Sequence, residues 1–136
     1  MRQYQTQLPE ETERVGAAIA EHAKTGDVFL LHGELGAGKT TLVRGFLRAL
    51  GYAEPVRSPT FALIQLFETD PPVLHADLYR GQSHRGLGLE DYLEDHVCFV
   101  EWPDRADGLF PEGTTTEVHF EVTPTGRTIR ITPPGE

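Results

Sequence analysis

The sequence predicts an α/β fold in which a mixed sheet lies between helices. The apolar run at residues 28–31 is short and flanked by polar residues, as is typical of a buried strand. A glycine-rich loop follows it, and apolar residues at helical spacing then continue up to Gly51. Residues 117–122 and 128–132 alternate apolar and polar side chains on either side of a turn. This alternation predicts an antiparallel hairpin at the C-terminal end of the sheet.

The first helix is expected to begin at about residue 8, because Pro9 and two acidic residues would occupy its first turn. Val15, Ala18 and Ile19 would share its apolar face, and Gly26 lies where the chain leaves the helix. The strand at 28–31 and the helix after the glycine-rich loop come next. These elements place a strand, a loop and a helix in immediate succession.

The middle of the chain is predicted to alternate strands and loops. In order, we expect a strand at 61–67, a second strand at 73–78, a loop at 82–88, a short acidic helix at 89–94 and a buried strand at 97–100. Because helices and strands alternate early and strands predominate late, the pattern favours a three-layer sandwich with helices on both faces and added antiparallel strands. In such sheets, ligands bind outside the carboxyl ends of the parallel strands.

Residues 33–41 carry the strongest functional signal. Gly33, Gly38, Lys39 and Thr40 match the spacing G-x-x-x-x-G-K-[ST] of the phosphate-binding loop of P-loop NTPases. The pattern predicts that backbone N–H groups bind phosphates, that the lysine contacts the β- and γ-phosphates, and that the threonine hydroxyl binds Mg²⁺. The predicted phosphate cradle also includes Gly36, Ala37 and Thr41. A glycine-rich turn with no ligand is the alternative, but such a turn does not require lysine followed by threonine.

Two acidic residues follow apolar segments and are candidates for work beside the phosphates. Glu101 follows the apolar run 97–100, and Asp77 follows a run that His75 interrupts. We expect Glu101 to lie on the Mg²⁺ side and Asp77 to lie near the γ-phosphate. The spacing leaves open which of them orients the attacking water. The alternative for either acid is that it only caps the end of a strand and faces solvent. Thr60 is a candidate sensor of the γ-phosphate, with an ordinary turn as the alternative.

Length and composition point to one domain covering residues 1–136 in a reducing compartment, with the cytoplasm as the default. Cys98, the single cysteine, lies in an apolar run and is expected to be a buried hydrophobic residue. The six histidines show no metal-ligand spacing with it, so a structural zinc site is not expected. No apolar run is long enough to cross a membrane. The formal charge of −9 disfavours tight binding of nucleic acid unless a partner supplies the basic surface.

Four segments together resemble the TsaE (YjeE) family, the bacterial ATPases of tRNA threonylcarbamoyladenosine synthesis. They are Leu-His-Gly-Glu-Leu-Gly-Ala-Gly-Lys-Thr-Thr at 31–41, Ser-Pro-Thr-Phe at 58–61, His-Ala-Asp-Leu-Tyr-Arg at 75–80 and Val-Glu-Trp-Pro at 100–103. The resemblance implies a single P-loop domain whose ATP hydrolysis is slow in isolation. It also implies assembly with TsaB and TsaD, which transfer a threonylcarbamoyl group to adenosine 37 of tRNAs that read ANN codons.

By the same resemblance, residues 36–41 form the ATP loop, Thr40 and Glu101 occupy magnesium-associated positions, and Asp77 is needed for activity. The chain contains no asparagine and so lacks the guanine-selecting signature of small GTPases, which favours ATP. Residues 8–12 are a candidate border of the adenine pocket. Two other functions stay open at this point: a nucleotide-dependent binding switch with incidental hydrolysis, and a small-molecule kinase.

Overall fold

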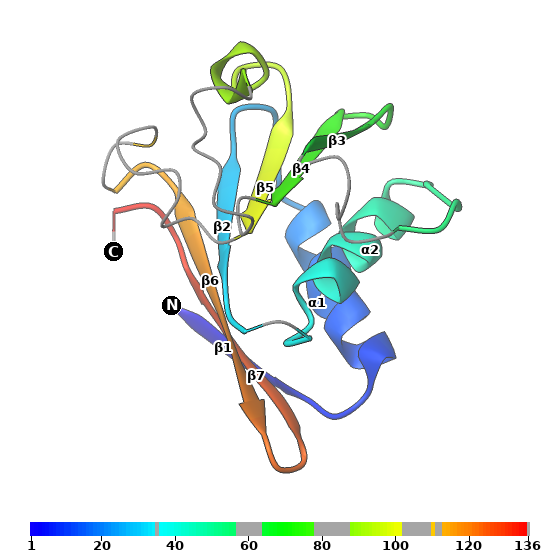
Figure 1. Ribbon diagram of the computed structural model, residues 1–136, viewed down its shortest axis with the longest axis vertical. Coiled ribbons are helices and arrows are strands. Elements are labelled where there is room, and N and C mark those ends of the chain that lie inside the picture. The colour runs from blue at the N-terminus through cyan, green and yellow to red at the C-terminus, as the bar shows by residue number, and fades with distance from the viewer. Residues whose placement is uncertain (35, 57–63, 78–87, 102–109, 111–112, 136) are drawn as a thin grey trace.

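The computed structural model describes the chain apart from residues 35, 57–63, 78–87, 102–109, 111–112 and 136. Its centre is a seven-stranded mixed sheet with the strand order β1-β7-β6-β2-β5-β4-β3 (Figure 1). The predicted α/β class, the mixed sheet and the C-terminal antiparallel hairpin are confirmed. None of the helices in the described ranges is long and apolar enough to span a lipid bilayer.

In the part of the chain that the structure describes, two α-helices and one short 3₁₀-helix lie between the strands. In order, the elements are β1 (Arg2–Thr6), α1 (Pro9–Ala20), β2 (Val28–His32), α2 (Lys39–Ala49), β3 (Ile64–Phe67), β4 (Val73–Asp77), η2 (Leu89–Asp91), β5 (Val97–Glu101), β6 (Thr116–Thr123) and β7 (Gly126–Thr132). The predicted start of the first helix is confirmed. The carboxylate of Glu11 accepts hydrogen bonds from the N–H groups of Gln7 and Leu8 at 2.6 and 2.9 Å, which lowers the pKa of Glu11.

Four neighbouring strands of the sheet are parallel, and three of them end beside the glycine-rich loop. β2 lies between β5 and β6 and is parallel to both, and β4 is parallel to β5. Their register places Leu31 beside Glu101 and Asp77 beside Glu101. The carboxyl ends of β2, β4 and β5 therefore meet at one edge, and the chain leaves β2 there to begin α2 (Figure 1).

The two faces of the sheet are covered differently. Both α-helices of the described residues pack on one face, over a core that includes Phe29, Phe46 and Phe99. On the other face, Leu89 of η2 packs on Leu30 and its neighbours. We expected helices on both faces of the sheet. Within the described ranges, this one-turn helix is the only helix on the second face. The expected acidic helix at 89–94 is correspondingly shorter, Leu89–Asp91.

Strand β1 was not predicted from the sequence. It pairs antiparallel with β7 at the edge of the sheet, and only Thr6 among its residues is buried. An edge strand with one buried side chain shows almost no alternation of apolar and polar residues. Its sequence therefore cannot be told from that of a polar N-terminal tail. The Thr6 hydroxyl lies 3.0 Å from the Thr12 hydroxyl, which joins β1 to α1. Cys98 is fully buried as expected, and burial raises the pKa of its thiol to about 12.

The two α-helices cross at two glycines. A Cβ atom on Gly45 would lie 2.1 Å from the carbonyl oxygen of Glu13, and one on Gly16 would lie 2.1 Å from the carbonyl oxygen of Leu42. Beside this crossing, the Glu13 carboxylate accepts hydrogen bonds from Arg44 at 3.1 Å and from Arg48 at 2.7 Å. The close backbone approach fixes α2, and with it the glycine-rich loop, against α1.

We expect Gly45→Ala to lower the free energy of unfolding by about 1–3 kcal/mol, because the new methyl group overlaps backbone that cannot move aside easily. Helix propensity alone acts in the opposite direction, since alanine is favoured over glycine by about 1 kcal/mol in a helix interior. The sign of the change therefore decides between the two effects. Urea denaturation followed by circular dichroism measures it, and a stabilised variant would show that the helices do not approach this closely.

Candidate nucleotide-binding site

The glycine-rich loop joins the end of β2 to the first turn of α2. Gly36 and Gly38 have φ angles of 81° and 109°, in the left-handed region that residues with a Cβ atom rarely adopt. Gly38 directly precedes Lys39, the first residue of α2. Ala37 between the two glycines is fully buried and belongs to the core. The loop thus presents backbone rather than side chains at the N-terminal end of a helix, where N–H groups have no partner within the helix.

Lys39 brings one positive charge to this loop from a buried position. Its side chain is 3% exposed, and its Nζ donates a hydrogen bond to the carbonyl oxygen of Gly33 at 2.6 Å. Nζ also lies 4.0 Å from an oxygen of Glu101. Desolvation lowers the pKa of Lys39, and the charges of Glu101 and Asp77 oppose this effect. An anionic ligand beside the ammonium group would favour its charged form further.

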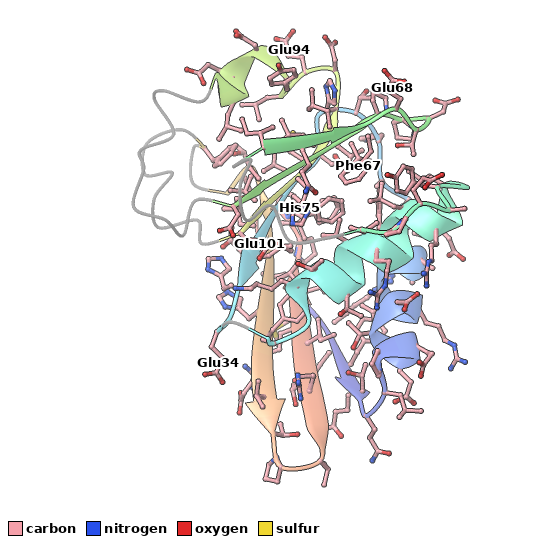
Figure 2. The ribbon with its side chains drawn as sticks, turned by 45° about the vertical axis from the view of Figure 1, so that its right-hand side comes forward. Glu34, Phe67, Glu68, His75, Glu94 and Glu101 are labelled. Carbon is pink, nitrogen blue, oxygen red and sulfur yellow. The ribbon has the colours of Figure 1, made fainter. Side chains whose placement is uncertain are left out.

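Glu101 connects three elements at the carboxyl edge of the sheet. Its side chain is 4% exposed, and one of its oxygens accepts a hydrogen bond from the Thr40 hydroxyl at 3.5 Å. The same oxygen is in close contact with Nε2 of His75. Figure 2 shows His75 and Glu101 on neighbouring strands, next to the start of α2. Glu101 therefore lies among a hydroxyl, an ammonium group and an imidazole.

His75 was not predicted as a site residue, because in the sequence it only interrupts an apolar run. It is fully buried on β4, and within the described residues its Nδ1 has no hydrogen-bond partner. Strand alternation could have revealed it, since His75 lies two residues before Asp77 and so faces the same side of the sheet. Asp77 itself is buried, and its register beside Glu101 places both predicted carboxylates at the same edge.

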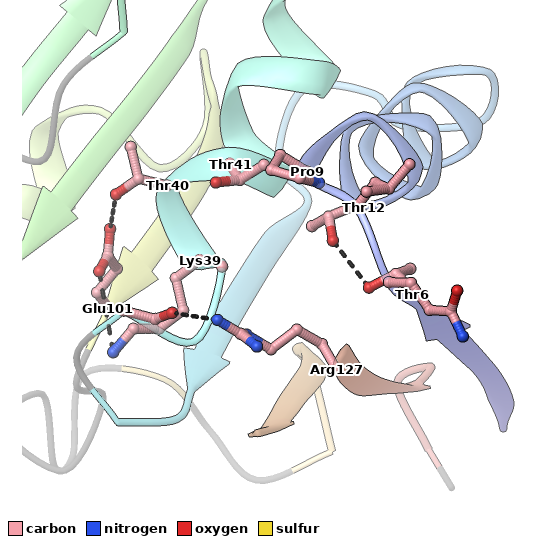
Figure 3. Close-up of a pocket in the computed structure, with 12 residues that line it drawn as sticks. Thr6, Pro9, Thr12, Lys39, Thr40, Thr41, Glu101 and Arg127 are labelled. Atoms are coloured by element: carbon pink, nitrogen blue, oxygen red, sulfur yellow. Dashed lines mark hydrogen bonds and ion pairs between the residues drawn. The ribbon is translucent and has the colours of Figure 1, made fainter. Parts of the chain in front are cut away.

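A cavity of about 340 Å³ opens beside the loop (Figure 3). One wall is Gly36, Gly38, Lys39, Thr40, Thr41 and Glu101; the other is Thr6, Gln7, Leu8, Pro9, Thr12 and Arg127. The predicted border at residues 8–12 thus lines the cavity in part. Arg127, which sequence reasoning missed, donates hydrogen bonds to the carbonyl oxygens of Gly126 at 2.9 Å and Gly36 at 3.2 Å. It comes from the hairpin β6–β7, and no spacing in the sequence connects it to the loop.

The remaining predicted residues divide into two groups. Gly33 and Ala37 do not line the cavity, but Gly33 holds the Lys39 ammonium group and Ala37 anchors the loop in the core. Thr60 lies outside the described residues.

The donor set at the start of α2 fits a magnesium ion. Mg²⁺ prefers oxygen ligands, and it usually takes one or two from the protein and the others from water and phosphate. The Thr40 hydroxyl and the Glu101 carboxylate supply two oxygens 3.5 Å apart, beside backbone that can hold phosphates. These two side chains are the ones that would hold the ion.

Comparison with known proteins identifies the family of this chain. The sequence model of the family described as "Threonylcarbamoyl adenosine biosynthesis protein TsaE" matches residues 6–129. The chain belongs to the TsaE family. The family is one of tRNA threonylcarbamoyladenosine biosynthesis, and the TsaE match covers both the glycine-rich loop and the two carboxylates.

Individual TsaE proteins and one solved structure are similar over most of the chain. The TsaE protein of Bacillus subtilis is 40% identical over 112 residues, which cover 80% of this chain and 71% of the relative. That of Haemophilus influenzae is 35% identical over 117 residues, covering 77% and 74%. The crystal structure of Bacillus subtilis YdiB superimposes with a TM-score of 0.84 at 33% identity and covers 98% of this chain and 86% of YdiB.

Proposed function

We propose that this TsaE-family protein binds ATP with Mg²⁺ and hydrolyses it, and that hydrolysis drives or resets a complex that forms threonylcarbamoyladenosine at position 37 of tRNAs reading ANN codons. One observation carries the proposal: the Lys39 ammonium group, the Thr40 hydroxyl and the Glu101 carboxylate gather where a glycine-rich loop meets the N-terminus of α2. A bare structural turn requires none of these three groups.

The residues divide the work of phosphoryl transfer to water among them. The N–H groups of residues 36–41 and the start of α2 bind the phosphates. Lys39 neutralises charge on the β- and γ-phosphates, and Thr40 and Glu101 hold Mg²⁺. A Mg²⁺ ion held by these two side chains would supply positive charge that stabilises the charge developing on the phosphates. Asp77, beside Glu101, is our candidate for positioning the attacking water.

The far end of the cavity supports a nucleotide rather than free phosphate. The cavity continues from the loop to the segment from Thr6 to Thr12 and to Arg127. We infer that the base and ribose lie there, between α1 and the hairpin. The hydrogen bond from Arg127 to the Gly36 carbonyl joins this wall to the loop, so nucleotide binding would be coupled to the position of the hairpin.

The charge of the chain supports a role through partners rather than direct binding of tRNA. A formal charge of −9 leaves little basic surface for a phosphate backbone. We propose that TsaB- and TsaD-like proteins in the cytoplasm carry the tRNA and complete the ATPase site. Groups supplied in trans raise phosphoryl-transfer rates in other P-loop enzymes by factors of about 10³–10⁵.

We expect slow phosphate release from ATP by the protein alone, faster release when TsaB and TsaD are added, and little release from GTP. Steady-state phosphate release with each nucleotide, with and without the partners, measures all three. Phosphate release without any acceptor would count against a small-molecule kinase. If a non-hydrolysable ATP analogue supports repeated rounds of tRNA modification, the protein is a binding switch and hydrolysis is incidental.

A further inference from the structure

A second group of ligand-type side chains lies on the sheet away from the nucleotide cavity. His32, Glu117 and His119 each offer one potential metal-ligand atom. These three atoms lie within 4.8 Å of one another. We propose that these three side chains form a binding site for a divalent transition-metal ion, with Zn²⁺ as the best match. The proposal concerns a site separate from the Mg²⁺ position at Thr40 and Glu101 and does not depend on ATP hydrolysis.

Strand pairing places the three side chains on one face. β2 and β6 are parallel neighbours with His32 opposite His119, and Glu117 lies two residues before His119 on the same face. The two imidazole rings stack with their centroids 4.3 Å apart and their planes 6° from parallel. Oε1 of Glu117 lies 2.6 Å from Nε2 of His32. An imidazole binds a metal in the plane of its ring, so the two rings would have to turn out of this stack for their nitrogens and the Glu117 oxygen to surround a single ion.

This face is opposite to the one that carries the nucleotide cavity. His32 alternates with Leu31, so it points to the side of Leu30, which is packed against η2. Leu31 belongs to the core under the α-helices and lies in register beside Glu101. The sheet itself thus separates the two groups of side chains, and a metal bound at His32 would not share ligands with one bound at Glu101.

The carboxylate is already oriented by a neighbour. The buried Thr115 hydroxyl donates a hydrogen bond to Oε2 of Glu117 at 2.7 Å, which leaves Oε1 directed at His32. Hydrogen bonds of this kind orient the ligands of metal sites and raise their affinity. The side chains of His32 and Glu117 are 26% and 33% exposed, so an ion can reach them from solvent.

The donor set selects the ion. Two imidazoles and one carboxylate, with a further position open to water, are a common zinc arrangement. Mg²⁺ prefers oxygen ligands and is disfavoured by two imidazoles. The linear sequence hides the site, because His32 and Glu117 are 85 residues apart.

The test is calorimetric titration of Zn²⁺ into the untagged full chain, free of nucleotide and previously treated with a chelator. We expect one Zn²⁺ per chain and no comparable heat from Mg²⁺. His119→Ala should lower the zinc affinity at least tenfold, because it removes one ligand. Thr115→Val keeps all three ligands and should still lower the affinity by about tenfold, because hydrogen-bond partners that orient a metal ligand are typically worth 10–100-fold.

Two controls make the assignment specific. His22→Ala removes an exposed histidine on another part of the molecule and should leave the zinc affinity unchanged. His75→Gln removes the imidazole beside Glu101, and loss of zinc binding in that variant would move the site to the nucleotide cavity and overturn the proposal. No stoichiometric binding by the wild-type chain, or wild-type affinity in folded His119→Ala, would overturn it as well. Circular dichroism of each variant establishes that it is folded.

Discussion

Lys39→Ala is expected to lower the rate of ATP hydrolysis by at least about a hundredfold. The ammonium group lies in a buried position between the Gly33 carbonyl and Glu101, where water screens its charge poorly. Removing one preorganised donor from a site that stabilises developing charge costs about 10²–10³ in turnover in well-studied enzymes. No other lysine can take over, because the only other one, Lys24, lies beyond the C-terminal end of α1.

Lys24→Ala is the matched control, since each variant removes one of the chain's two lysines. Lys24 is exposed, so its loss should leave phosphate release within about twofold of the wild type. Lys39→Met keeps most of the buried side-chain volume and separates loss of charge from loss of packing. Phosphate release by all three variants, with circular dichroism as the check on folding, makes the comparison. Turnover at the wild-type rate in Lys39→Ala would refute the role assigned to this residue.

The parts of the fold that the sequence predicted are those with strong local signals. The buried strand before the loop, the glycine spacing and the helix after it lie within one continuous stretch, residues 28–50. The hairpin from Thr116 to Thr132 was predictable for the same reason, because each strand alternates and a turn joins them. Strand β1 carries no such signal, since its partner β7 lies at the opposite end of the chain.

The site residues divide in the same way, into those with a local sequence signal and those placed by the order of the strands. Lys39 and Thr40 were predicted from a motif, and Glu101 and Asp77 from the rule that ligands bind at the carboxyl ends of parallel strands. His75 and Arg127 reach the site through strand register and through the hairpin, and neither is near the loop in sequence. Their contribution depends on which strands are neighbours. Sequence pattern alone does not fix that order, although alternation along β4 would have placed His75 on the same face as Asp77.

Glu101→Gln is expected to preserve nucleotide binding in the absence of Mg²⁺ and to remove the additional affinity that Mg²⁺ provides. The carboxylate is buried, lies 3.5 Å from the Thr40 hydroxyl and carries the charge that we assign to the metal side of the site. Glutamine keeps the shape and one carbonyl oxygen but removes that charge. We expect nucleotide affinity measured in EDTA to stay within a few fold of the wild type, the gain on adding Mg²⁺ to be largely lost, and hydrolysis to fall about a hundredfold or more.

Asp77→Asn tests the division of labour between the two carboxylates. The acids lie in register on adjacent strands, so each variant removes one charge from the same edge of the sheet. If Asp77 positions water, its variant should lose hydrolysis and keep the gain in affinity on adding Mg²⁺. Glu121→Gln, on an exposed carboxylate of β6, is the control for a general loss of negative charge and should change neither quantity. Titration of a fluorescent ATP analogue with and without Mg²⁺ gives the affinities. A full Mg²⁺ response in Glu101→Gln together with its loss in Asp77→Asn would exchange the two roles, because the metal must then lie against β4.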